Sequence, residues 1–119
     1  MKLITLNTHS LVEPDYENKL KLFAEAVLRE RPDVVALQEV NQSMGEPAVG
    51  QERLGALGFV ECRGRGNESE VEAGARGAVI PVRADNHAYR LAGLLAEGGS
   101  PYFWTWVPAK IGYGRYDEG

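Results

Sequence analysis

The sequence predicts an α/β fold that opens with a strand–helix–strand unit, and three observations lead to this class. Residues 2–7 alternate weakly between apolar and polar side chains, as a strand does. Residues 16–31 carry apolar side chains at helical spacing, and residues 34–37 form a continuous apolar run of strand length. A helix between two such strands favours a parallel pair joined by a right-handed crossover.

The first helix has the clearest pattern. Its apolar positions fall at i, i+3, i+4, i+7 and i+8, which is the stripe of an amphipathic helix. These positions are Leu20, Phe23, Ala24, Val27 and Leu28. Asp15 is a suitable N-cap, and the helix is expected to end near Arg31, because Pro32 disfavours helical geometry in the residue before it.

The second strand runs into a carboxylate. Residues 34–37 are all apolar, and two of them are β-branched, so we expect a strand that is covered on both faces. Parallel strands bring their carboxyl ends to one edge of a sheet, where α/β proteins usually bind ligands. Asn7 and Glu39 should therefore lie at the same edge.

The middle of the chain gives weaker signals. Residues 51–57 suggest a short helix that Gly58 ends. Residues 63–84 are rich in glycine, glutamate and arginine, and are expected to form a flexible loop. A phosphate-binding interpretation of Gly64-Arg65-Gly66 is disfavoured against a flexible linker, because no helical pattern follows it directly.

The last third contains a second helix and an aromatic segment. Asp85 or Asn86 should cap a helix that Gly98-Gly99 ends. Residues 102–107 are rich in aromatic side chains and predict a strand whose main role is in the core. Residues 111–116 are expected to form a loop that returns toward the site.

Composition and charge limit the function classes. The chain has 119 residues, a length typical of one domain. Its net charge of −4 argues against broad attraction to a nucleic-acid backbone. Cys62 is the only cysteine, so no internal disulfide can form and a reducing cytoplasm is the expected compartment. There is no apolar run of about 18 residues, so no integral membrane segment is expected.

Two motifs resemble a known family. Asn7 at the end of the first strand, followed one helix later by Leu37-Gln38-Glu39-Val40, resembles the endonuclease/exonuclease/phosphatase superfamily of DNase I-like, metal-dependent phosphoesterases. The resemblance implies that Asn7 helps to hold the active site and that Glu39 binds the catalytic magnesium, or manganese in its place. The segment Tyr116-Asp117-Glu118-Gly119 is similar to the beginning of the family's next strand.

The resemblance covers the first half of the family's domain. That domain is a four-layer α/β/β/α sandwich of two similar halves, so residues 1–119 should form the N-terminal half, a mixed sheet with helices on one face. The family's Asp-x-Asn pair and its closing Ser-Asp-His, which supplies the general base, have no counterpart in the 119 residues. A half-sandwich would expose an apolar sheet face, so we expect a homodimer or association with a second half-domain.

Other residues are candidates for the same site. His9 follows two residues after Asn7 and could act as an acid or base, or could be a polar loop histidine. His87 lies at a helix N-terminus, where it could contact a phosphate or simply belong to the cap. Tyr113 and Arg115 lie in a basic, aromatic stretch that could grip a phosphate or stack on a base, or could be a solvated loop.

Three functional hypotheses stay open. The first is the N-terminal portion of a magnesium-dependent phosphoesterase that acts on phosphodiesters or phosphomonoesters, in a small molecule, a lipid headgroup or a nucleic acid. The second is a catalytically inactive interaction or nucleotide-binding module that uses the open sheet of the half-fold. The third is a truncated product with an incomplete fold.

Overall fold

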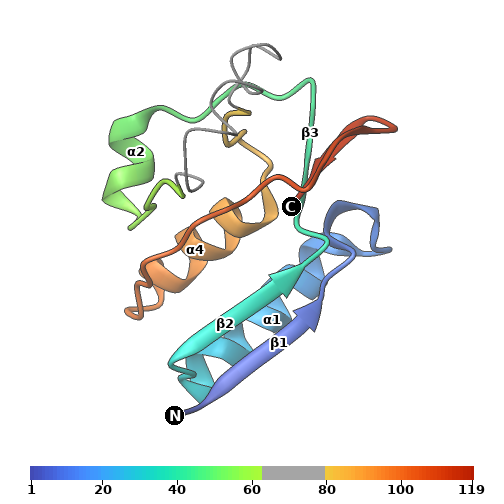
Figure 1. Ribbon diagram of the computed structural model, residues 1–119. Helices are drawn as coiled ribbons and strands as arrows, with labels where there is room; N and C mark the ends of the chain where they lie inside the picture. Colours follow the sequence, from blue (N-terminus) through green and yellow to red (C-terminus); the bar gives the residue numbers. More distant parts are fainter. Residues whose placement is uncertain (63–79) are drawn as a thin grey trace.

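The structure is a computed structural model that describes residues 1–62 and 80–119, apart from the side chains of Ile111 and Tyr113 (Figure 1). Helices and strands alternate along the first half of the chain, which confirms the α/β class. The elements are β1 (Leu3–Asn7), the 3-10 helix η1 (Ser10–Val12), α1 (Tyr16–Glu30), β2 (Val34–Gln38), β3 (Asn41–Ser43), α2 (Gln51–Ala56), α4 (His87–Glu97), β4 (Lys110–Tyr113) and β5 (Tyr116–Glu118). No helix in the described ranges is both long enough and apolar enough to cross a membrane.

The strand–helix–strand unit forms as the sequence predicts. β1 and β2 pair in parallel, with Leu3 opposite Val34 and Asn7 opposite Gln38. The pairing extends past the strands, because the Thr8 backbone N–H donates to the Gln38 carbonyl at 3.0 Å. Figure 1 shows α1 crossing behind both strands, so the carboxyl ends of β1 and β2 lie together at one edge.

The remaining strands form a separate antiparallel sheet in the order β3-β5-β4, where a single mixed sheet was expected. Asn41 pairs with Glu118 and Ser43 with Tyr116. The two sheets separate at Glu39, whose φ of 55° is left-handed and interrupts the extended chain between β2 and β3. Beyond this residue the chain exchanges β1 for β5 as its pairing partner.

The larger core lies between α1, α4 and one face of β2. Its fully buried members come from the two helices: Leu20, Ala24, Val27, Leu91 and Leu95. Val35 and Leu37 of β2 pack against this cluster, so the apolar stripe of α1 docks as predicted. Asp15 occupies the N-cap position of α1, but its carboxylate accepts from the Asn18 side chain and makes no capping bond to the backbone.

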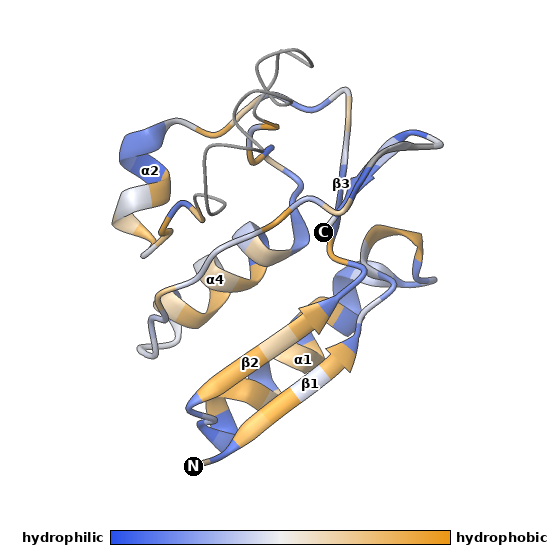
Figure 2. Cartoon of the chain, in the orientation of Figure 1, coloured by the Kyte–Doolittle hydropathy of each residue, from blue (hydrophilic) through white to orange (hydrophobic). Residues whose placement is uncertain are grey.

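The second face of the parallel pair is open, so the prediction that β2 is covered on both faces is wrong. Leu3 is 58% exposed and Val34 is 42% exposed, and no element of the described ranges covers them. Figure 2 shows that both strands consist mostly of apolar residues. The apolar run in β2 was a sound strand signal, but α1 and α4 both pack on the same face.

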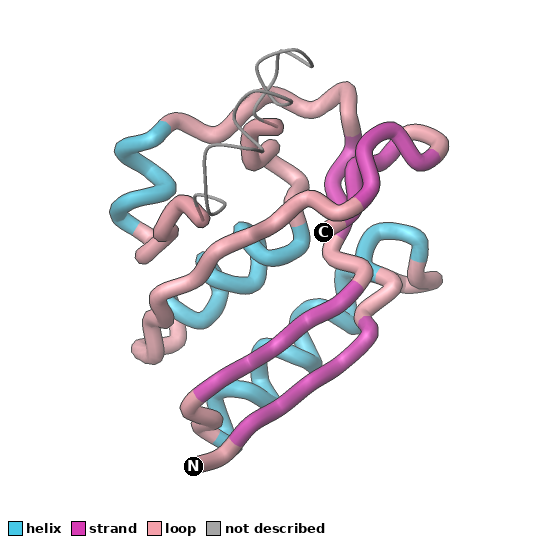
Figure 3. Tube along the Cα trace, in the orientation of Figure 1, coloured by secondary structure: helices cyan, strands magenta, loops and turns pink. Residues whose placement is uncertain are grey.

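In the last third of the chain, the predicted helix is confirmed but the predicted strand is not. Asn86 caps α4 by accepting from the Tyr89 backbone N–H at 3.1 Å, and the helix ends before Gly98. Residues 102–107 are extended but form no strand, since their one ladder contact is the bridge between Phe59 and Trp104 (Figure 3). A strand requires a hydrogen-bonded neighbour along its length, and in the described ranges this segment has one at Trp104 only.

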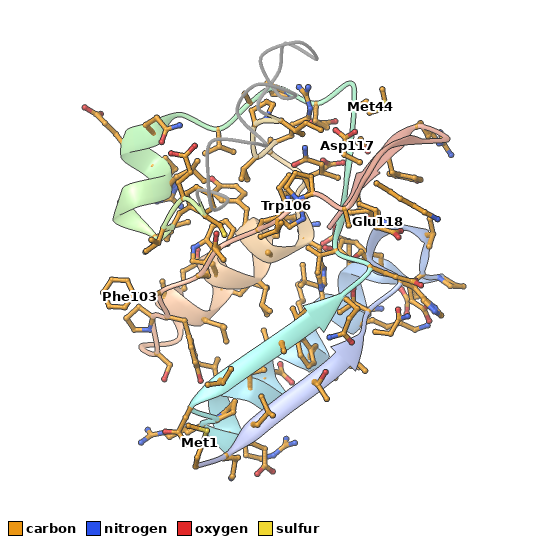
Figure 4. All side chains as sticks on the ribbon, viewed as in Figure 1. Met1, Met44, Phe103, Trp106, Asp117 and Glu118 are labelled. Carbon is orange, nitrogen blue, oxygen red and sulfur yellow. The ribbon has the colours of Figure 1, made fainter. Side chains whose placement is uncertain are left out.

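The segment expected to be a returning loop is a β-hairpin. β4 and β5 pair around a tight turn at Gly114, and positive φ angles occur at Gly114 in the turn and at Gly112 within β4, where the register is irregular. The residues of the aromatic segment before the hairpin differ in burial. Trp106 is buried, whereas Phe103 points outward and is 88% exposed (Figure 4). The core role predicted for this segment is confirmed for Trp106, with Tyr102 and Trp104 packed against the two cores, and is wrong for Phe103.

The predicted flexible loop lies largely outside the described ranges. Residues 63–79, with Gly64-Arg65-Gly66 among them, are not described. At the end of the predicted loop, Val82 is buried in a second core with Val40, Leu54 and Trp106. Arg83 forms an antiparallel bridge with Ala48, which ties this end to the segment before α2.

Candidate active site at the edge of the parallel strands

The turn after β1 is built from residues with unusual backbone geometry. His9 and Ser10 have φ angles of 50° and 47°, a region that L-residues other than glycine enter rarely. The Asn7 side-chain oxygen accepts from the His9 backbone N–H at 3.3 Å, which fixes the side-chain amide group. The NH₂ group of Asn7 is then left as the donor that this residue presents at the sheet edge.

Buried polar side chains hold Glu39 against this turn. The Glu39 carbonyl accepts from the Ser10 hydroxyl at 2.6 Å and from the Thr8 hydroxyl at 3.2 Å. Asn41 accepts from the Leu11 backbone N–H at 3.0 Å and donates to the His9 carbonyl at 3.4 Å. A left-handed glutamate costs about 1–3 kcal/mol, so these bonds are what keep its carboxylate at the edge.

His9 lies between two carboxylates. Its Nδ1 is 3.2 Å from Glu13 Oε2, and its Nε2 is 3.6 Å from Glu39 Oε2. The hydrogen bond from Lys19 to Glu13, at 2.6 Å, is the main reason that the pKa of Glu13 is lowered, and the bond with His9 adds to it. Because an ionised carboxylate only accepts, Nδ1 of His9 carries a proton and Nε2 is the atom that faces Glu39.

A hollow of about 510 Å³ opens beside Glu39, between η1 and the β4-β5 hairpin. Acidic, basic and amide groups line it together: Glu39, Glu118, Lys110, Arg115, Asn41 and Tyr116. Asn41 and Glu118 are paired neighbours in the antiparallel sheet, and Figure 4 labels Glu118 on this strand. The structure therefore brings Arg115 to the same hollow as Glu39.

The side-chain chemistry fits one weakly held magnesium ion. The Glu39 side chain is 40% exposed, and one of its carboxylate oxygens lies 3.6 Å from His9 Nε2. Within the described ranges there is no group of three or more histidine, cysteine, aspartate or glutamate residues that could hold a metal. Magnesium suits such a site, because it keeps several waters and is commonly bound by one or two carboxylates together with a substrate phosphate.

His87 lies on the other side of His9. A second hollow, of about 360 Å³, is lined by Asn7, His9, Tyr16 and His87 among others. The His87 side chain is buried, and its Nδ1 is 2.8 Å from the Tyr16 hydroxyl. Burial lowers the pKa of His87 to about 4, with Arg90 contributing, and burial raises the pKa of Tyr16 to about 12.

These pKa shifts define the proton positions in the pair. The Tyr16 phenol keeps its proton and donates it to Nδ1 of a neutral His87, so the remaining ring proton is on Nε2. Nε2 is buried without a hydrogen-bond partner among the described residues. The structure therefore places His87 as a neutral residue of the contact between α1 and α4, with one buried ring N–H that has no partner among the described residues.

Acid should destabilise the protein through His87. The folded state holds the neutral ring with a pKa of about 4, whereas the unfolded chain protonates it near pH 6.5. The contribution of neutral His87 to the free energy of unfolding is therefore fully present above pH 6.5. It decreases by up to about 3 kcal/mol as the pH falls toward 4.

Urea unfolding of the parent and of a His87→Phe variant, between pH 7 and pH 4, measures this contribution. The variant should lose less stability than the parent over that range. His9→Gln is the matched control, since it removes the other histidine of the chain, which is largely exposed. Equal acid sensitivity of the parent and His87→Phe would contradict the assignment.

The structure brings some of the predicted site residues together. Asn7, His9 and Glu39 come together at one edge, and Arg115 reaches the hollow beside Glu39. The side chain of Tyr113 lies outside the described part of the structure, although its backbone pairs with Tyr116. Sequence reasoning missed Ser10 and Asn41, which are buried and hold Glu39, and Glu118, which lines the hollow.

Comparisons with known proteins support one family. Neither a protein-family model nor a curated protein sequence matches this chain. Among solved structures, the chain is similar to an endonuclease/exonuclease/phosphatase family protein from Leptotrichia buccalis C-1013-b, with a TM-score of 0.70 and 25% sequence identity. The match covers all of this chain and 35% of that one, so the chain spans about a third of its length.

The fold and the position of the polar edge thus define an α/β chain with a carboxylate at the carboxyl end of parallel strands. The resemblance to the endonuclease/exonuclease/phosphatase family, first given by Asn7 and Glu39, is confirmed by this similarity of structure.

Proposed function

We propose that this chain is the N-terminal portion of a magnesium-dependent phosphoesterase, in which it forms one half of a four-layer α/β/β/α sandwich. One observation carries the proposal. The Glu39 carboxylate is held by a left-handed backbone at the carboxyl edge of two parallel strands and borders a hollow that Arg115 also lines. A carboxylate and a guanidinium around one hollow suit a divalent cation and a phosphate bound together.

The residues of this edge have complementary roles in the proposal. Glu39 would hold Mg²⁺, or Mn²⁺ in its place, and a bound cation supplies Lewis-acid stabilisation of charge on a phosphoryl oxygen. Arg115 would bind non-bridging phosphate oxygens, and the Asn7 amide would donate to another. His9, with Nδ1 held by Glu13, can take up or release a proton at Nε2.

The substrate class follows from charge. Basic side chains at the hollow favour a phosphorylated ligand, whereas the net charge of −4 disfavours wide contact with a nucleic-acid backbone. A phosphodiester or phosphomonoester in a small molecule or a lipid headgroup is therefore the favoured substrate, ahead of bulk nucleic acid.

A second candidate function rests on the open face of β1 and β2. Leu3 and Val34 are exposed there, which favours an interaction module that associates as a homodimer or with a second half-domain. Such a module would associate through this face without any response to a divalent metal. The metal response therefore distinguishes the two candidates.

The test is a magnesium titration followed by thermal melting. At about ten times its Kd, magnesium should raise the free energy of unfolding of the parent by about 1.4 kcal/mol and the Tm by a few degrees. Glu39→Gln should abolish this rise, because it keeps the side-chain shape but removes the charge. Glu25→Gln, on the exposed side of α1, is the matched control and should respond as the parent does.

Either of two results would refute the assignment. One is an equal magnesium response in the parent and in Glu39→Gln, which would place the cation elsewhere. The other is no response in the parent at millimolar magnesium, with or without a phosphate ester present, which would favour the interaction module.

A further inference from the structure

His9 and Glu39 bring two different ligand atoms close together at the edge of the parallel strands. His9 Nε2 lies 3.6 Å from Glu39 Oε2, which is too long for a hydrogen bond. Two ligand atoms that each lie about 2.1 Å from one metal ion are about 3.0–3.4 Å apart at the usual coordination angles. A shift of a few tenths of an ångström would therefore let one ion bind both atoms.

The ring of His9 is held through its other nitrogen. Nδ1 donates to Glu13 Oε2 at 3.2 Å, and Lys19 Nζ donates to the second oxygen of that carboxylate at 2.6 Å. A histidine that binds a metal almost always donates its other ring N–H to a carboxylate, a backbone carbonyl or a water, which fixes the tautomer and the orientation of the ring. The contact with Glu13 gives His9 this arrangement.

The neutral ring of His9 then presents an acceptor to another acceptor. With its proton on Nδ1, the ring turns the lone pair of Nε2 toward Glu39, and an ionised carboxylate has no proton to donate. Two acceptors cannot bond to each other, so a cation between them is the arrangement that satisfies both. Figure 1 shows the ends of β1 and β2 side by side at this place, next to the loop that leads into η1.

Backbone geometry and exposure support the same site. His9 and Glu39 both have left-handed backbones, with φ angles of 50° and 55°. Such strain in residues other than glycine gathers at ligand sites, where the surrounding structure maintains it. Both side chains can be reached by an ion from solvent, since 57% of the His9 side chain and 40% of the Glu39 side chain is exposed.

We propose that His9 Nε2 and Glu39 together bind one divalent first-row transition ion, such as Mn²⁺, in preference to Mg²⁺. Imidazole nitrogen is a good ligand for transition ions, whereas Mg²⁺ prefers oxygen ligands and loses its waters reluctantly. Water and a substrate phosphate would fill the other positions around the ion. The inference rests on the proposed function and changes its preferred cation, and Nε2 is then bound to the ion instead of exchanging a proton.

Calorimetric titrations of the whole chain with Mn²⁺ and with Mg²⁺ test the proposal. The parent should bind Mn²⁺ with a Kd at least about tenfold lower than its Kd for Mg²⁺. His9→Asn should raise the Kd for Mn²⁺ at least about tenfold and leave the Kd for Mg²⁺ within about twofold of the parent value. Asparagine tolerates a left-handed backbone, and the melting temperature of the variant reports whether the fold is kept.

Glu13→Leu tests the carboxylate that orients the ring. Loss of such a partner typically weakens metal binding about 10–100-fold, so the Kd for Mn²⁺ should rise at least about tenfold while the Kd for Mg²⁺ stays near the parent value. Glu25→Leu is the matched control, because Glu25 is an exposed carboxylate of α1, and it should change neither Kd.

Pulsed EPR of bound Mn²⁺ identifies the ligand directly. Nitrogen modulation from an imidazole ligand should appear in the parent and disappear in His9→Asn. His87 is the other histidine of the chain, so His87→Phe is the matched control and should keep the modulation.

Two results would overturn the proposal. One is an equal Kd for Mn²⁺ in the parent and in His9→Asn, and the other is bound Mn²⁺ without nitrogen modulation. Either would mean that His9 forms only an ion pair with Glu39. If Glu39→Gln still abolishes the magnesium response in that case, the proposed function stands and the role of His9 alone fails. A magnesium response that persists in Glu39→Gln would instead refute the proposed function and this inference together.

Discussion

Gln42→Leu is expected to lower the free energy of unfolding by about 3–5 kcal/mol, because one buried and two half-buried polar groups lose their partner. The Gln42 side chain is fully buried. Its oxygen accepts from the Arg83 backbone N–H at 2.8 Å and from the Asn86 side chain at 3.0 Å, and its nitrogen donates to the Pro81 carbonyl at 2.8 Å. Leucine has nearly the same size, so the loss comes from unpaired polar groups at about 1–3 kcal/mol each.

The measurement is urea unfolding of the parent, Gln42→Leu and Gln51→Leu. Gln51 is exposed at the start of α2, so the same chemical change there should alter the free energy of unfolding by no more than about 0.5 kcal/mol. If Gln42→Leu matches Gln51→Leu, then Gln42 does not join β3 to the start of α4 in the way described.

Leu20→Ala is expected to cost about 3–4 kcal/mol. Leu20 is 2% exposed and lies in the core between α1 and α4, so truncation removes buried methyl groups and leaves a cavity. Thermal or urea unfolding measures the loss directly. Because the helices of this cluster also support β2, the variant should weaken the whole strand–helix–strand unit and not the helix alone.

Leu22→Ala is the matched control on the same helix. Leu22 is 64% exposed, so the same truncation should cost less than about 1 kcal/mol. Similar losses for Leu20→Ala and Leu22→Ala would show that α1 does not dock through the stripe that begins at Leu20.

The sequence was most informative where the signal is local. The spacing of Leu20, Ala24 and Val27 predicts both the helix and its buried face, since a helix is defined by contacts within a few residues. The parallel pairing of β1 with β2 followed, because a short crossover leaves few alternatives. The placement of Asn7 and Glu39 at one edge is a direct result of that pairing.

Non-local pairing accounts for most of the errors. Residues 110–113 and 116–118 carry no regular alternation, and their strands depend on contact with Asn41–Ser43, which is more than 60 residues earlier in the chain. The aromatic segment 102–107 shows the reverse case, in which a strand-like pattern lacks a neighbour in the described ranges. β-propensity describes a surface suited to pairing, and it does not identify the partner.

The candidate site also combines residues that the sequence indicates with residues that only tertiary contacts bring into place. The family resemblance singled out Glu39 as a candidate, but the residues that hold it could not be inferred from the sequence. Ser10 and Asn41 act through buried hydrogen bonds that exist only in the folded turn. Glu118 lines the hollow because of the register of β5 with β3, a feature that is set by tertiary contacts.

The left-handed backbone of Glu39 has a consequence for the variation this position can tolerate. The backbone geometry favours glycine, which enters this region without strain, while the proposed chemistry requires a carboxylate. Under the proposed function, stability and activity therefore favour different residues at this position, because glycine would relieve the backbone strain and a carboxylate would bind the cation. Variants selected for stability alone should then lose the glutamate at this position.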